Sequence, residues 1–141
     1  MLLSVKRNKR LALALLGLAA VGCGAPQTFV AGRVTLDGAP VGKAGIEFKS
    51  SGRGGFTGVA FTDADGRYRA RVASSPLTAV IRAYRVVGKE KVPRFEGGPL
   101  EDELQQYLPA RYSDPGKSDL RITPVAGKTT VADFALTSDK K

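Results

Sequence analysis

A pair of aspartates is the first feature of this chain that could do chemistry. Asp63 and Asp65 lie in the stretch DADG, where alternating carboxylates could direct oxygen atoms towards a hard cation such as Ca²⁺ and Gly66 would permit a sharp turn. A complete calcium loop of this kind also needs an acidic residue at its twelfth position, where Ser74 stands. The stretch therefore favours a turn in which the aspartates bond to the backbone, and we expect no metal site.

The residue types that the chain lacks restrict its catalytic chemistry. It contains no histidine and a single cysteine, which excludes a Ser-His-Asp triad, a Cys-His pair and a zinc centre with nitrogen and sulfur ligands within the chain. The acidic stretch Glu101–Glu103 could supply a carboxylate pair, but such clustering is more typical of the start of a helix. Serine–lysine chemistry remains open, although no motif indicates it. We expect no enzymatic activity and no cofactor.

Arginines and tyrosines provide the candidate binding residues. Arg67, Arg69 and Arg71 alternate along an expected strand and would share one face of it, and Arg82 and Arg85 follow on a later strand. Guanidinium groups bind carboxylates and phosphates in a bidentate manner, so this face could bind an acidic polysaccharide or lipid headgroups, or could simply be solvated. The aromatic side chains that could stack on sugars are Tyr84, Tyr107, Tyr112 and Phe95.

The single cysteine indicates where the protein goes. Four basic residues and an apolar run of 11 residues precede Cys23, whereas a membrane-spanning helix needs about 20 apolar residues. This layout is typical of a secretory signal peptide. The stretch AVGC, residues 20–23, resembles the lipobox of bacterial lipoproteins. The resemblance implies cleavage before Cys23 and attachment of acyl chains such as palmitate to it. The alternatives are an ordinary secreted protein and an uncleaved short anchor.

The charge of the remaining chain is modest. The whole chain carries a net charge of +9, but 4 of its 22 basic residues and none of its 13 acidic residues precede Cys23, which leaves 18 basic against 13 acidic residues. The surplus is scattered, without a basic run of five, so we expect no nucleic-acid binding. No cysteine follows Cys23, so an exported domain would have to be stable without disulfides.

The elements that would position these side chains are short strands. Period-two patterns predict strands over residues 30–36, 44–50, 56–62, 67–72 and 77–87, with two more around residues 126–127. Asp65-Gly66 would join the third and fourth strands as a hairpin. Residues 88–118 are expected to be a long connection with a short helix over residues 100–107. About seven short strands predict an all-β fold, a single antiparallel β-sandwich that follows the signal segment.

Two blocks of sequence resemble a known family. The stretches GRVTLDGAPVGKAGIEF and GVAFTDADGRYRARV are similar to the carboxypeptidase regulatory-like domain. The positions that carry this resemblance are Asp37, Gly38, Pro40, Ala44, Thr62, Asp63, Gly66 and Tyr68. The later block LPARYSDPGKSDLRITPVAGKTT is similar to one in small lipoproteins of planctomycete-type bacteria. The resemblance implies an immunoglobulin/transthyretin-like sandwich with an accessory or adhesive role rather than an enzyme.

These expectations define a domain organisation and a function. The expected segments are a lipoprotein signal peptide (1–22), a lipidated tether (23–28), the sandwich (29–137) and a polar tail (138–141). The protein would be an exported, membrane-anchored lipoprotein of the bacterial cell envelope, with a binding or structural role. Its partners would be membrane lipid, through Cys23, and an envelope protein or polysaccharide. The alternative is a polysaccharide-recognition domain that uses Arg67, Arg69, Arg71, Tyr84 and Tyr107. An enzyme without histidine is the second alternative.

Overall fold

Strands make up just over half of the residues that the structure describes. The structure, a computed structural model, describes residues 22, 24–52, 55–91, 97 and 99–139. Residues 1–21 of the expected signal peptide, the expected lipidation site at Cys23 and Phe95 lie outside the described residues. The strands are β1 (Thr28–Leu36), β2 (Ala39–Pro40), β3 (Gly45–Ser50), β4 (Phe56–Phe61), β5 (Arg67–Val72), β6 (Leu77–Arg82), β7 (Tyr84–Lys91), β8 (Leu100–Gln106), β9 (Arg121–Ile122), β10 (Thr129–Val131) and β11 (Phe134–Leu136), with one short helix, α1 (Ala110–Ser113).

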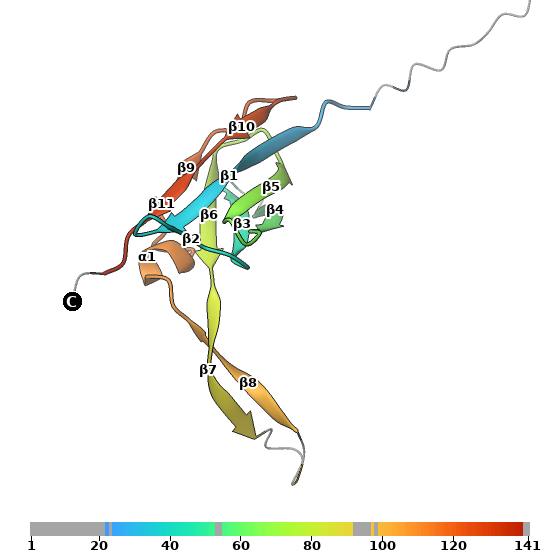
Figure 1. Cartoon of the computed structure of the whole chain (residues 1–141). Helices are drawn as coiled ribbons and strands as arrows, with labels where there is room; N and C mark the ends of the chain where they lie inside the picture. Colours follow the sequence, from blue (N-terminus) through green and yellow to red (C-terminus); the bar gives the residue numbers. More distant parts are fainter. Residues whose placement is uncertain (1–21, 23, 53–54, 92–96, 98, 140–141) are drawn as a thin grey trace, which may run out of the picture.

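Two sheets pack face to face and confirm the all-β sandwich (Figure 1). The first sheet is built around β1, which pairs antiparallel with β5 and β2 and parallel with β10 and β11. The second sheet has the order β4-β3-β6-β9, and all its pairings are antiparallel. The sandwich is therefore mainly antiparallel, and the returning C-terminal strands add the parallel pairings on one side of β1.

The core lies between the sheets and follows the predicted period of two. Along β5, residues Tyr68, Ala70 and Val72 are buried while the arginines between them are exposed. The Tyr68 ring lies 6.0 Å from that of Phe48 on the facing sheet and 5.9 Å from that of Phe134. Burial, together with the nearby charge of Asp133, raises the pKa of Tyr68. Its hydroxyl therefore stays protonated and donates to a backbone carbonyl, that of residue 132, at 2.6 Å.

The expected hairpin over residues 56–72 is wrong, because its two strands belong to opposite sheets. β4 pairs with β3, whereas β5 pairs with β1. The connecting turn crosses the edge of the sandwich because it is bonded to both sheets. The Gly66 carbonyl accepts the N–H of Val34 in the first sheet. The hydroxyl of Thr62 donates to the carbonyl of Val41 at 2.6 Å and accepts the N–H of Ala44 at 2.8 Å beside the second sheet.

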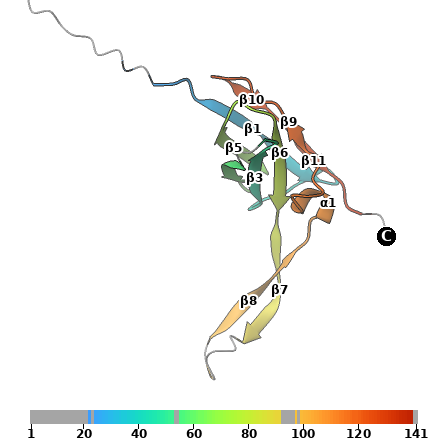
Figure 2. The ribbon, with the colours of Figure 1, turned by 180° about the vertical axis from the view of Figure 1, so that it is seen from behind.

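The predictions for residues 77–118 are also corrected. The expected single strand 77–87 divides at Ala83 into β6, inside the second sheet, and β7, which leaves the sandwich. β7 pairs with β8 to form an arm that projects from the body, so residues 88–118 are not one long connection (Figure 2).

The expected helix over residues 100–107 is wrong, because these residues form β8. The acidic stretch Glu101–Glu103 pairs across the arm with residues 88–90 of β7, and the Asp102 carboxylate lies 2.5 Å from the Lys89 ammonium group. This cross-strand partner outweighs the helical preference of the sequence LEDELQQ. The helix itself begins later, after Pro109.

Candidate functional site

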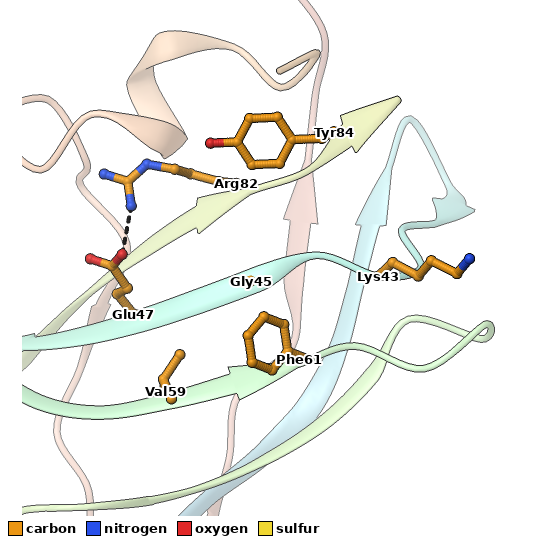
Figure 3. A pocket seen from close by; sticks show the side chains of 7 residues that line it. All are labelled: Lys43, Gly45, Glu47, Val59, Phe61, Arg82 and Tyr84. Carbon is orange, nitrogen blue, oxygen red and sulfur yellow. Dashed lines mark hydrogen bonds and ion pairs between the residues drawn. The ribbon is translucent and has the colours of Figure 1, made fainter. Parts of the chain in front are cut away.

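The outer surface of the second sheet is hollowed by a cleft of about 270 Å³. We call it the outer cleft, and its lining residues are Lys43, Gly45, Glu47, Val59, Phe61, Arg82 and Tyr84 (Figure 3). They come from the turn before β3 and from β3, β4, β6 and β7. Because Ile46, Phe48, Ala79 and Ile81 of the same strands point into the core, Glu47 and Arg82, at alternate positions, point outwards into the cleft.

The strand register explains the hollow. Gly45 lies directly opposite Phe61 on one side and Arg82 on the other. Because Gly45 has no side chain, the floor of the cleft is low between the rings of Phe61 and Tyr84, which stand on either side of β3 (Figure 3). These rings are 72% and 52% exposed, far above the usual exposure of a large aromatic side chain. The cleft therefore offers two aromatic surfaces to a ligand.

The polar residues of the cleft are partly paired. The Arg82 guanidinium donates to the Glu47 carboxylate at 2.7 Å, and the Lys49 ammonium lies 3.5 Å from the same carboxylate. Lys43 adds a further cation from a turn in which its φ is +57°. Cations thus outnumber the single carboxylate around the rings. This arrangement suits a ring-shaped ligand that bears an acidic group, because the rings can stack and the cations can bind the acid.

A second surface carries the predicted arginines. Arg67, Arg69 and Arg71 are exposed on β5, and Arg33 of β1 lies directly opposite Arg67. We call these four residues the arginine face. The Arg69 guanidinium lies 4.3 Å above the ring of Phe29, and Arg33 Nε donates to a turn carbonyl at 2.7 Å. Arg33 was not predicted as a binding residue. The available signal was its place beside the apolar Val34, because alternation along β1 puts Arg33 on the outer face.

The predicted polysaccharide site is not brought together. The arginine face lies on the outer side of the first sheet, whereas Tyr84 lines the outer cleft on the second. Tyr107 is half-buried against the core, with the Arg85 guanidinium 5.9 Å from its ring. Tyr112 is buried, and its hydroxyl accepts the N–H of Thr137 at 3.1 Å.

The outer cleft combines predicted and unpredicted residues. Tyr84 and Arg82 were singled out from the sequence, whereas Phe61, Lys43 and Glu47 were not. No local sequence signal could have found Phe61, because its position depends on the register that places it opposite Gly45.

Of the two aspartates of the DADG stretch, Asp63 bonds to the backbone as expected. The Asp63 carboxylate accepts the N–H groups of Asp65 and Arg67, each at 2.9 Å, and Gly66 has a φ of +76°. Among the described residues, no group of three or more potential metal-ligating side chains gathers. In the same part of the chain, no helix is long and apolar enough to span a bilayer.

Comparison with known proteins does not assign the chain to a family. No family model matches the chain, and neither does any curated protein. Among solved structures, the crystal structure of a 9R-lipoxygenase from Cyanothece PCC8801 matches with 14% sequence identity and a TM-score of 0.46. The match covers 79% of this chain but 16% of the lipoxygenase. At this level the likeness supports no conclusion about fold or activity.

Proposed function

We propose that the protein is a lipid-anchored module of the bacterial cell envelope with a non-enzymatic binding role. The outer cleft is the observation that carries the binding role, because it presents two exposed aromatic rings beside Lys43 and the Arg82–Glu47 pair. The resemblance to the carboxypeptidase regulatory-like domain supports the same role. The lack of histidine in the sequence argues against catalysis.

The anchor is proposed from the sequence. Cys23 follows the basic and apolar segments, and β1 begins at Thr28, five residues later. A tether this short would hold the sandwich close to the membrane. Acylation with more than one chain is sufficient for stable anchoring, since each buried methylene contributes about 0.8 kcal/mol.

The intact mass of the detergent-extracted protein tests the anchor. We expect a chain that begins at Cys23 and carries acyl groups, and we expect Cys23→Ser to lose both the acyl mass and the membrane fraction. The membranes are washed with concentrated salt first, because this screens purely electrostatic attachment. A circular dichroism spectrum controls for folding of the variant. A native chain without acyl groups, or a variant that stays in the washed membranes, would contradict the anchor.

A second candidate function is recognition of an acidic polysaccharide, and the outer cleft specifically favours it. A sugar ring could stack on Phe61 or Tyr84 while its carboxylate binds Arg82. Lys43 extends towards the other end of the cleft (Figure 3), where it could bind the acid of a neighbouring sugar unit. The site differs from the one expected from the sequence, because the arginine face and Tyr107 lie elsewhere.

Titration with oligogalacturonate tests this recognition. We expect Tyr84→Ala and Arg82→Gln each to weaken binding by about tenfold, the effect of losing roughly 1.4 kcal/mol from a stacking or charged contact. Arg85→Gln is the matched control, because it removes the same charge from the adjacent exposed position on β7 without lining the cleft. Equal losses in the two arginine variants, or equal binding of uncharged dextran, would count against the cleft.

A further inference from the structure

We propose that the arginine face lies against the surface of a bilayer that contains anionic lipids. The face is the part of the first sheet in which rows of side chains cross from β5 through β1 to β10. Arg71 lies opposite Phe29, Arg69 opposite Ala31, and Arg67 opposite Arg33. Four guanidiniums are therefore collected on one side of two strands.

The charges of the face are available for a partner. All four arginines are exposed, and within the described part of the chain none of their guanidinium groups forms an ion pair with a carboxylate within 4.0 Å. Two carboxylates contact the backbone of the face. That of Asp133 accepts the N–H of Arg33 at 2.8 Å, and that of Asp63 accepts the N–H of Arg67 at 2.9 Å. Both stand at the end of the face away from Arg71. Arg33 Nε already donates to the carbonyl of Asp65. The exposed guanidiniums of the three arginines on β5 can bind phosphate groups well, because their donors match the phosphate oxygens.

Apolar side chains lie among these charges. Val131 of β10 is opposite Ala31, on the same side of the sheet as the arginines, and is 76% exposed. The Phe29 ring lies beneath Arg69 and is half-buried. Apolar groups surrounded by cationic groups suit the interface of an anionic bilayer, where the apolar part enters the boundary of the acyl chains and the cations meet the headgroups.

The position of the face in the fold favours a bilayer over an acidic polysaccharide. The row that contains Arg71 and Phe29 stands at the start of β1, where the tether ends. Five residues reach at most about 18 Å, so an anchor at Cys23 would hold the face near the headgroups. The β7–β8 arm projects from the opposite end of the molecule (Figure 1). The anchor is part of the proposed function, and this step of the inference rests on it.

Close tethering matters because electrostatic attraction is short-ranged. At physiological salt, exposed charges act over a Debye length of about 8 Å. Basic residues held at an anionic surface each strengthen attachment by about fivefold. Neutralising Arg67, Arg69 and Arg71 should therefore reduce docking of the face on the order of 100-fold.

A fluorescent probe on the face tests the proposal, since the chain contains no tryptophan. Val131→Trp is introduced into the full chain, which is reconstituted into vesicles of phosphatidylcholine with or without 30% phosphatidylglycerol. The same fraction of the phosphatidylcholine is brominated in both mixtures. We expect the probe to be quenched by brominated lipid when phosphatidylglycerol is present and not in phosphatidylcholine alone. Val86→Trp is the matched probe on the arm, where Val86 is also exposed, and it should remain unquenched.

Two triple variants separate a specific face from general charge. Arg67→Gln with Arg69→Gln and Arg71→Gln should abolish quenching of the Val131→Trp probe at lipid concentrations that saturate the parent. The control triple removes the same charge at exposed residues outside the face: Arg85→Gln, Lys89→Gln and Lys117→Gln. In the control triple, the Val131→Trp probe should be quenched as strongly as in the parent.

Several results would overturn the proposal. The first is an unquenched Val131→Trp probe in anionic vesicles, and the second is equal quenching in both lipid mixtures. The third is an equal loss of quenching in the two triple variants. If the first triple instead loses binding to polygalacturonate while the probe is never quenched, the face belongs to a polysaccharide. Quenching reports the face, and the intact mass reports the anchor, so failure of one can be told from failure of the other.

Discussion

Phe48→Ala should lower the free energy of unfolding by about 3–5 kcal/mol, the usual cost of removing a fully buried aromatic ring. Phe48 has no exposed surface and extends from β3 towards the first sheet. Its ring packs near Tyr68, which in turn stacks with Phe134. Removal of the Phe48 ring would leave a cavity between the sheets, because the strands on both sides are fixed by their hydrogen bonds and cannot close around the cavity.

Phe61→Ala is the matched control for this prediction. It makes the same chemical change on the neighbouring strand, but Phe61 is 72% exposed and lines the outer cleft, so stability should change by about 0.5 kcal/mol or less. Urea unfolding followed by circular dichroism measures both variants. We expect a lower midpoint for Phe48→Ala with an unchanged slope. Similar midpoints for the two variants would mean that the core does not depend on this ring.

The sequence predicted the sandwich well where local chemistry decides the structure. The alternation of arginines with Tyr68, Ala70 and Val72 is sufficient to define β5 and its two faces. Asp37 and Gly38 are residue types that favour a turn, and both adopt positive φ angles, of 50° and 84°. These features depend on side-chain period and on backbone preference, which are properties of a few adjacent residues.

The features that the sequence did not predict depend on distant partners. Asp65-Gly66 looks the same whether the next strand returns to the same sheet or crosses to the other one. The long-range pairing of β5 with β1 decides between them, together with the bond from Val34 to Gly66. β8 has a sequence that suits a helix, yet its strand partner β7 overrides that preference. The outer cleft also needs long-range register, because Gly45 becomes its floor only when β4 and β6 lie on either side.

Gly66→Ala should be the most disruptive change in the turns of the protein, with a loss of about 3–4 kcal/mol of stability, because Gly66 is buried at the turn between β4 and β5. Gly66 has a φ of +76°, and a Cβ atom there would lie 2.4 Å from the Val34 carbonyl oxygen and 3.2 Å from the Val41 nitrogen. The left-handed conformation alone costs about 1–2 kcal/mol. The remainder arises because the clashing atoms belong to backbone that is already hydrogen-bonded and can move only by distorting the turn or β1.

Gly38→Ala separates these two costs. Gly38 has a similar φ of +84°, but a Cβ atom there would meet nothing within 4 Å, so this variant should lose only the conformational cost of about 1–2 kcal/mol. The difference between the two urea midpoints then measures the close approach of the turn to β1. Because this turn joins β4, which lines the outer cleft, to β5, which carries three arginines of the arginine face, Gly66→Ala should also weaken oligogalacturonate binding and vesicle docking together. Equal stability of the two variants would show that the turn can move away from β1 without cost, and the two surfaces would then not depend on its close packing.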